Sequence, residues 1–178
     1  MDAVSNEDVV NDAVSDVVNV VVAGLGGQGV ITASDIVADA AFRSGHDVKK
    51  AEVHGMSQRG GSVSTDVRYG DRVLSPMVPD RAADYLVVLA EDQVEVFRHR
   101  LRPGGVLIEP SALGGERLPH PRSLNVALLG VLSAHLDILE ATWLDAIHEA
   151  LEPKLHPVNE RAFAMGRRIG TNPRPGSD

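Results

Sequence analysis

The sequence VVNVVVAGLGGQG, residues 17–29, decides the fold class of this chain. Its first seven residues are almost all apolar, which is typical of a strand buried on both faces of a sheet. The next six, Gly24 to Gly29, fit the pattern G-x-G-x-x-G between a strand and a helix. Such glycines allow a tight turn and a close approach of the backbone, and the following helix N-terminus offers free N–H groups to a phosphate. We predict a ligand contact here; the alternative is that the glycines only let the helix pack on the strand.

The residues after this loop argue against NAD as the ligand. An NAD site uses an acidic residue at the end of the second strand, about 20 residues after the glycines. Near that point the chain has Lys49 and Lys50, and Glu52 follows slightly later. Lysines suit a phosphate-rich ligand, but they do not hold a ribose diol as a carboxylate does. We therefore expect Lys49 and Lys50 to be available to an anionic coenzyme.

Outward from the loop, strand and helix patterns alternate along the chain. This alternation predicts one α/β domain with a Rossmann-like, open, mainly parallel sheet, helices on both faces and a β-hairpin. The period-two pattern of residues 62–69 predicts a half-buried strand, with a turn at Gly70-Asp71 and a return strand over 72–74. Thr142 is expected to cap a helix. The predicted strands are 17–23, 47–51, 62–69, 84–90 and 106–109, and the predicted helices are 30–42, 91–101, 124–136, 142–151 and 159–169.

Composition and charge narrow the class of protein. The 178 residues carry 17 Lys and Arg against 25 Asp and Glu, a net charge of −8, and five of the acids lie in residues 1–16. We therefore divide the chain into an acidic tail (1–16), a folded domain (17–170) and a flexible tail (171–178). With no cysteine, the chain offers no disulfide, thiolate zinc site, cysteine nucleophile or cysteine-ligated iron–sulfur cluster. We expect a cytoplasmic protein that binds neither membrane nor nucleic acid.

A second polar, glycine-rich loop covers residues 52–61, EVHGMSQRGG. It follows a predicted strand, at the sheet edge where open α/β sheets bind ligands. Arg59 can clamp a carboxylate or phosphate with two parallel hydrogen bonds, and His54 can titrate or donate near neutral pH. Taken singly, each could instead be an ordinary surface residue. Their common place in a glycine-framed loop favours a functional role for both.

Two further polar residues are candidates for the same site. Glu91 is either a helix-start carboxylate or a site residue at the sheet edge. Asn125 opens an apolar helix and is either a cap or a buried polar contact, of which we favour the cap. The other histidines are scattered without ligand spacing, so no metal site is predicted.

Together these segments resemble the gamma-type domain of 2-oxoacid:ferredoxin oxidoreductases, and most closely the indolepyruvate branch of that family. The resemblance covers roughly residues 19–170. The string from His54 to Gly61, at its distance from the glycine loop, is the specific part. The matching segments are 24–30, 51–63, 67–70, 75–76, 83–84, 91, 101–105, 125, 129–130, 159, 162–163 and 166.

The resemblance implies a subunit rather than a complete enzyme. That family converts a 2-oxo acid to an acyl-CoA, with thiamine diphosphate and iron–sulfur clusters on a large alpha subunit that passes electrons to ferredoxin. Coenzyme A is the co-substrate, and indolepyruvate or a related aryl 2-oxo acid is the expected donor. No catalytic residue is expected in this chain alone. The implied cofactor-binding positions are Gly24, Gly26, Gly27, Gln28 and Gly29, and the implied substrate and coenzyme A loop is His54, Gly55, Ser57, Gln58, Arg59, Gly60 and Gly61.

The sequence is also compatible with two other functions. A stand-alone dinucleotide- or nucleotide-binding regulatory module would also carry a glycine loop. A structural lid that only seals an interface would need no ligand contact at all. The residues themselves assemble no nucleophile, base and orienting group, which agrees with any of the three.

Replacing Arg59 with alanine tests the clamp. In the assembled complex, Arg59→Ala is expected to weaken the use of coenzyme A or substrate by about 1.5–3 kcal/mol, because a bidentate pair is lost. Steady-state kinetics of the complex measure this loss as a change in kcat/KM. Unchanged kinetics would make Arg59 a solvated surface residue.

Overall fold

The computed structural model describes residues 17–54 and 61–172. The predicted acidic tail, residues 55–60 of the second loop and residues 173–178 lie outside the described residues.

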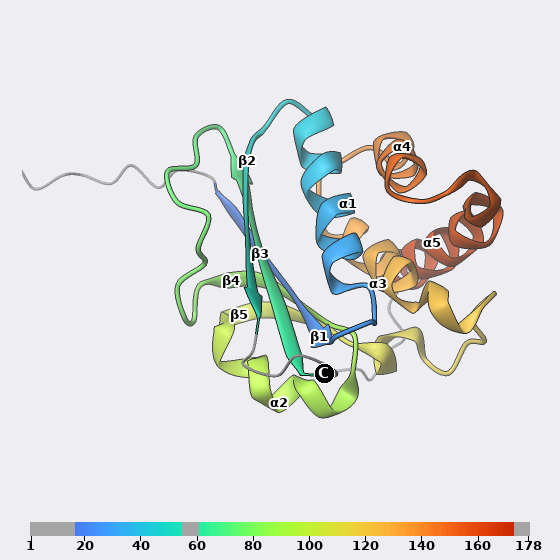
Figure 1. The fold of residues 1–178 in the computed structure, drawn as a ribbon, viewed down its shortest axis with the longest axis horizontal. Helices are drawn as coiled ribbons and strands as arrows, with labels where there is room; N and C mark the ends of the chain where they lie inside the picture. The colour runs from blue at the N-terminus through green and yellow to red at the C-terminus, as the bar shows by residue number, and fades with distance from the viewer. Residues whose placement is uncertain (1–16, 55–60, 173–178) are drawn as a thin grey trace, which may run out of the picture.

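Five strands form one open sheet in the order β2-β3-β1-β4-β5 (Figure 1). β1 is parallel to β4, which is parallel to β5, whereas β3 runs antiparallel to both β1 and β2. Four of the five strands therefore point the same way, which confirms the mainly parallel α/β sheet. The strands are β1 (Val18–Leu25), β2 (Asp47–His54), β3 (Ser62–Gly70), β4 (Ala83–Val88) and β5 (Leu101–Ile108).

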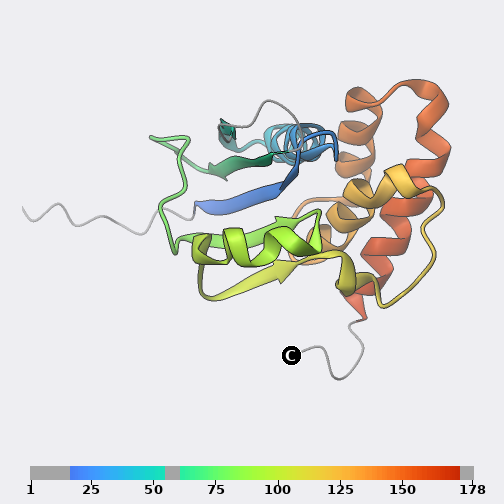
Figure 2. The same ribbon diagram turned by 60° about the horizontal axis from the view of Figure 1, so that its bottom comes forward.

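The two faces of the sheet are covered unequally. Four helices pack on one face and bury Val20 and Val22 of β1, while a short helical segment covers Val21 and Ala23 on the other. Figures 1 and 2 show α2 on its own, away from the other four helices. The helices of the first face are α1 (Val30–Arg43), α3 (Leu124–Ser133), α4 (Glu140–Ala150) and α5 (His156–Thr171). The opposite segment is η1 (Glu91–Gln93), α2 (Val94–Phe97) and η2 (Arg98–Arg100), and further 3₁₀ turns are η3 (Pro110–Leu113), η4 (Pro121–Ser123) and η5 (Pro153–Leu155).

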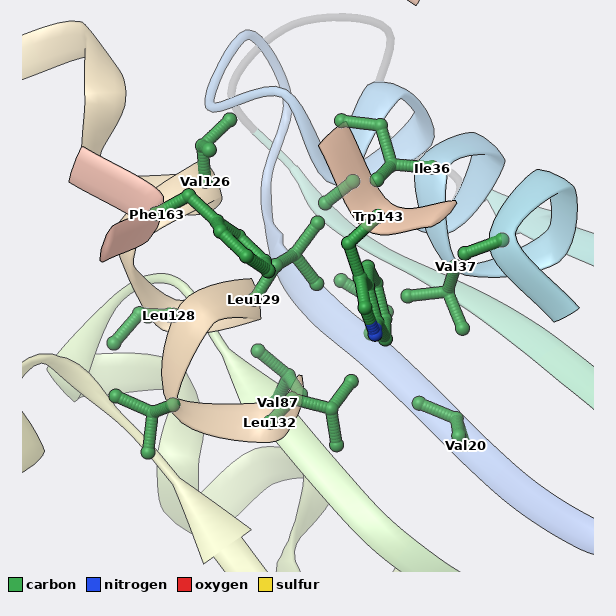
Figure 3. Packing of buried hydrophobic residues seen from close by; sticks show 14 of the residues in the cluster. Val20, Ile36, Val37, Val87, Val126, Leu128, Leu129, Leu132, Trp143 and Phe163 are labelled. Atoms are coloured by element: carbon green, nitrogen blue, oxygen red, sulfur yellow. The ribbon is translucent and has the colours of Figure 1, made fainter. Parts of the chain in front are cut away.

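The main core is aliphatic, with one aromatic pair at its centre. Trp143 and Phe163 are fully buried, and their ring centroids lie 5.9 Å apart. Figure 3 shows the Trp143 ring close to Ile36 and Val37 of α1. The aromatic-poor composition is therefore enough for the core, because these two rings, on α4 and α5, pack in one cluster with aliphatic side chains of α1 and α3.

Helices α3 and α5 touch backbone to backbone. A Cβ atom at Gly130 or Gly166 would collide with a carbonyl oxygen of the facing helix, that of Phe163 or Ala127 respectively. The two glycines thus let the helices approach more closely than any other residue type would permit. This contact sets the position of α3, whose N-terminus reaches the glycine loop.

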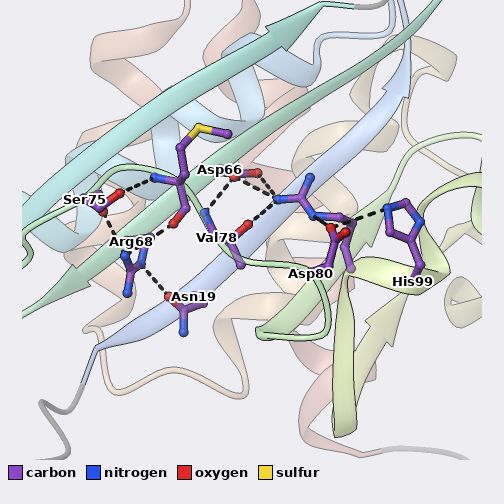
Figure 4. A network of polar contacts seen from close by, with 9 residues as sticks. Asn19, Asp66, Arg68, Ser75, Val78, Asp80 and His99 are labelled. Carbon is purple, nitrogen blue, oxygen red and sulfur yellow. Dashed lines mark hydrogen bonds and ion pairs between the residues drawn. The ribbon is translucent and has the colours of Figure 1, made fainter. Parts of the chain in front are cut away.

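β3 is buried on both faces, so its predicted half-buried pattern is wrong. Ser64, Thr65 and Asp66 are all nearly or fully inaccessible, because β3 lies inside the sheet with α1 on one face and residues 73–78 on the other. The carboxylate of Asp66 accepts hydrogen bonds from the backbone N–H of Val78 at 2.8 Å and from Nη2 of Arg100 at 2.9 Å. Figure 4 shows this network. The buried charge is therefore paired, as burial requires.

The predicted return strand over 72–74 is also wrong. The N–H of Val73 donates to the Asp47 carboxylate at 2.7 Å, and Arg68 Nη1 donates to the carbonyl of Ser75 at 3.0 Å. Side chains thus satisfy this segment's backbone groups, and it crosses the sheet face as a strap instead of pairing as a strand. The hairpin of this fold is β2–β3.

Two helix boundaries also differ from prediction. The segment predicted as the helix 91–101 is broken into η1, α2 and η2, and Pro103 to Gly105 belong to β5. Helix α4 begins at Glu140, with Leu139 at the N-cap position, so Thr142 lies inside the first turn and is not the cap. The helical segment ends at Arg100, and Leu101 already pairs with Ala83 of β4, so β5 begins five residues earlier than predicted.

Substitution of Gly166 tests the close helix crossing. Alanine gains about 1 kcal/mol of helix propensity, but its methyl group must push α5 away from α3. We expect Gly166→Ala to lower the free energy of unfolding by about 2 kcal/mol in urea denaturation. Ala164→Ser, on the exposed side of α5, serves as the control and should change it by less than about 0.5 kcal/mol. A stable Gly166→Ala protein would contradict the crossing.

Candidate functional site

The glycine loop is the turn between β1 and α1. Gly27 and Gly29 have φ angles of 87° and 82°, in the region that side-chain-bearing residues rarely adopt. The side chain of Gln28 folds back, and its Oε1 accepts a hydrogen bond of 2.7 Å from the N–H of Leu25. A Cβ atom at Gly24 would lie 2.8 Å from that oxygen. The loop conformation therefore needs glycine at 27 and 29, while a side chain at 24 would displace the Gln28 amide that shapes the turn.

The N-terminus of α1 opens onto this loop. Gly29 occupies the N-cap position without a side-chain cap, and the first turn of α1 has no acidic residue. The first N–H groups of a helix have no acceptor within it, and they carry partial positive charge. A recess of about 300 Å³ lies in front of them. It is lined by Leu25, Gly26, Gly27, Gly29, Val30, Ile31, Thr32 and Val63.

The second loop returns to the glycine loop. His54 is the last residue of β2 and pairs through its backbone with Val63 of β3. At the other end of the loop, the carbonyl of Gly61 accepts a hydrogen bond of 3.0 Å from the N–H of Gly26. The two predicted loops thus meet at one edge of the sheet. Gly55, Ser57, Gln58, Arg59 and Gly60 lie outside the described residues, so their roles stay predictions.

Asn125 contacts the glycine loop from α3. It is 8% exposed, and its Nδ2 lies 3.4 Å from the carbonyl oxygen of Gly29. A Cβ atom at Gly29 would come within 2.6 Å of that nitrogen. The favoured interpretation of Asn125 as a cap is wrong, because Ser123 holds the N-cap position, and the alternative of a buried polar contact is confirmed. Asn125 is the second residue of α3, and its amide reaches across to Gly29, the N-cap residue of α1.

Glu91 begins the 3₁₀ turn η1, three residues after the end of β4, and is exposed. Glu91 thus stands at the start of a helical turn, as one of our two interpretations requires. A role for its carboxylate in ligand binding stays a prediction.

The lysine pair behaves differently from our expectation. Lys50 lies on the α1 side of β2, where its Nζ contacts the carboxylate of Asp35 and, at 3.1 Å, that of Glu52. Burial opposes the charge on Lys50, but these two contacts outweigh it and raise the pKa of the amine. Lys49 projects from the opposite face, because side chains alternate along a strand. The positive charge of Lys50 is thus already balanced by two carboxylates. Since Lys49 and Lys50 lie on opposite faces of β2, the two lysines do not act together on one ligand.

Sequence reasoning missed two residues at this edge, Ser62 and Gln93. Gln93 is 8% exposed, and its Oε1 accepts a hydrogen bond of 2.5 Å from the Ser62 hydroxyl. A single glutamine in a predicted helix carries no sequence signal that would have singled it out.

A larger cavity of about 870 Å³ lies elsewhere, between β5, η3 and the C-terminal turn of α5. Its lining includes His135, whose pKa is lowered by burial, and the ion pair of Arg168 with Glu116. None of the predicted site residues lines it. Since its one arginine is already paired, the glycine-loop recess is the better site for an anion.

Residues 17–54 and 61–172 contain no group of three or more His, Cys, Asp or Glu side chains that could hold a metal ion. No helix among them is long and apolar enough to cross a membrane.

Comparisons with known proteins agree on one family. Residues 19–119 match the family model described as pyruvate ferredoxin/flavodoxin oxidoreductase. The chain is 46% identical over 190 residues to indolepyruvate oxidoreductase subunit IorB of Thermococcus kodakarensis, covering 83% of this chain and 93% of that protein. It is 33% identical over 134 residues to ketoisovalerate oxidoreductase subunit VorA of Methanothermobacter thermautotrophicus, covering 72% of this chain and 28% of that protein.

Solved structures share the fold. The gamma subunit of a keto/oxoacid ferredoxin oxidoreductase from Geobacter sulfurreducens superposes with a TM-score of 0.74 at 21% identity, over 86% of this chain and 96% of that one. A 2-oxoglutarate:ferredoxin oxidoreductase from Magnetococcus marinus, with 2-oxoglutarate, coenzyme A and succinyl-CoA bound, gives the same TM-score and identity over 86% of this chain and 31% of that one.

Paired glycine substitutions test how the loop is held. Gly27 and Gly29 share the same φ region, but a methyl group at Gly27 has nothing within 4 Å, whereas one at Gly29 meets Asn125. Gly27→Ala is expected to cost about 1–2 kcal/mol of unfolding free energy from backbone strain alone. Gly29→Ala should cost about 1–3 kcal/mol more because of the steric clash.

Urea denaturation of the full chain measures both costs. Adding Asn125→Ala to Gly29→Ala should remove most of the extra loss, because the clashing amide is gone. Equal losses for the two glycine variants would contradict the contact between Asn125 and the loop.

Proposed function

The chain belongs to the pyruvate ferredoxin/flavodoxin oxidoreductase family, and from that premise we propose that it is a non-cluster subunit of a 2-oxoacid:ferredoxin oxidoreductase. The named relatives include subunits of indolepyruvate and ketoisovalerate oxidoreductases, pyruvate synthase and 2-oxoglutarate synthase. A 2-oxo acid is common to all of these names. The 46% identity to an indolepyruvate oxidoreductase subunit favours indolepyruvate or a related aryl 2-oxo acid as the substrate.

The glycine-loop recess is the observation that carries this proposal. Backbone N–H groups at the start of α1 face a recess in front of Gly26, Gly27 and Gly29, and no acidic side chain of the first turn competes for them. Such a surface binds an anion by hydrogen bonds and by the helix dipole. We assign it to an anionic part of coenzyme A, the co-substrate present in the Magnetococcus marinus structure. Gly24 and Gln28 contribute the shape of the loop.

The second loop supplies the specific side chains of this proposal. Because Gly61 bonds to Gly26, residues from both loops leave the sheet at the same edge. Arg59 is proposed to clamp a carboxylate or phosphate, as two parallel hydrogen bonds allow. His54, Gly55, Ser57, Gln58, Gly60 and Gly61 complete the proposed loop.

The redox groups do not fit this chain. The 178 residues contain no cysteine, and the described residues hold no acidic or histidine cluster for a metal ion. Thiolates are the usual ligands of iron–sulfur clusters. We propose that a larger partner subunit carries thiamine diphosphate and the clusters and passes electrons to ferredoxin, while this chain binds and orients coenzyme A. A cysteine-free chain also fits the reducing cytoplasm, where we expect the complex to act.

Reconstitution tests the proposed function. The purified chain alone should not reduce a viologen dye with indolepyruvate and coenzyme A, whereas the chain combined with its large partner should. Omission of either subunit or of coenzyme A provides the controls. Dye reduction by the chain alone would overturn the proposal, and tight binding of NAD(H) to the isolated chain in calorimetry would favour the nucleotide-binding module instead.

A further inference from the structure

Gln93 stands out among the polar residues near the glycine loop. It is 8% exposed, while its neighbours Glu91 and Asp92 in the same 3₁₀ turn are exposed. Its side chain turns inward, and Oε1 accepts a hydrogen bond of 2.5 Å from Ser62 Oγ, 31 positions away in the sequence. A buried amide without a partner would be costly, so this contact determines where the Gln93 side chain can lie.

The hydrogen bond crosses the end of β1. Strands β3 and β4 flank β1 on opposite sides, Ser62 begins β3, and Gln93 lies five residues after β4 ends. Ser62 is also the register partner of Leu25, the last residue of β1. The Ser62–Gln93 contact therefore bridges the two neighbours of β1 at the point where the glycine loop leaves the sheet.

The two residues next to Ser62 both contact the glycine-loop recess: Val63 lines it, and Gly61 bonds to Gly26, which also lines it. The carbonyl of Gly61 accepts the hydrogen bond of the Gly26 N–H at 3.0 Å, and Val63 lines the recess. A shift of Ser62 along or away from the sheet would move both neighbours. Gly26 has no side chain of its own to hold it, so its position depends on this contact with Gly61.

We propose that Gln93 is a positioning residue for the glycine-loop site: through Ser62 it fixes Gly61 and Val63, and through them the backbone of Gly26 that faces coenzyme A. This inference rests on the proposed function for the identity of the ligand. Gln93 itself does not line the recess. It acts as a brace that holds the two loops at a fixed separation before the ligand binds, which is how a supporting residue raises affinity.

The first test needs no ligand. Amide hydrogen exchange of the full chain is measured for Gln93→Leu and Ser62→Ala, with Asp92→Asn as the control on the exposed side of the same turn. The Gly26 amide should exchange about threefold to tenfold faster in the first two variants and at the wild-type rate in the control, because one hydrogen bond of the brace is lost. Wild-type exchange in Gln93→Leu would overturn the proposal.

The second test uses the assembled complex. Gln93→Leu is expected to raise the KM for coenzyme A about threefold to tenfold, with kcat and the KM for the 2-oxo acid within about twofold of wild type. Ser62→Ala should behave in the same way, and Ser62→Thr, which keeps the hydroxyl, should restore the wild-type KM. A fall in kcat without a change in the KM for coenzyme A would overturn the positioning role.

The two tests separate failure of this inference from failure of the proposed function. A wild-type complex whose activity does not depend on coenzyme A would refute the ligand assignment, while the exchange rates of Gly26 would still decide whether Gln93 braces the loop. Normal coenzyme A dependence with an unchanged KM in Gln93→Leu would refute the inference alone.

Discussion

The burial of β1 on both faces is the constraint on which the rest of this structure depends. Residues 20–23 have no solvent exposure, and each face of the strand belongs to a separate apolar cluster. Because apolar side chains cover both faces of β1, its backbone N–H and C=O groups can form hydrogen bonds only with a strand on either side. These two strands are β3 and β4. Because β1 is central, the glycine loop leaves the sheet between its neighbours and can be held from several sides.

The antiparallel direction of β3 brings the two loops together. A strand that begins at the carboxyl end of β1 places its first residues beside the glycine loop, and Ser62 pairs with Leu25 in this way. A parallel strand in the same position would begin at the opposite edge, and Gly61, at the end of the second loop, would then lie far from the glycine loop. The β2–β3 hairpin is therefore the reason that Gly61 can bond to Gly26.

Three elements hold the glycine loop in its conformation. Gln28 closes the turn from within, Gly61 bonds to it from the position just before β3, and Asn125 contacts it from α3. The position of Asn125 depends in turn on the close crossing of α3 and α5 at Gly130 and Gly166. Distant parts of the chain thus give the loop its shape before any ligand binds, which lowers the conformational cost of binding.

The sequence by itself determined the fold class, the glycine loop and the family, because local signals carry them: an apolar run, glycines at fixed spacing and the string from His54 to Gly61. Period two wrongly predicted an exposed face for β3, because periodicity does not reveal that residues 73–78 cross back over it. Only the tertiary structure decided that Asp66 pairs with Arg100, that Lys50 is neutralised, and that Asn125 and Gln93 support the loop. The contacts of Arg100 with Asp66, Lys50 with Asp35, Asn125 with Gly29 and Gln93 with Ser62 join residues that lie between 15 and 96 positions apart. No local pattern encodes which distant side chain will satisfy a buried polar group.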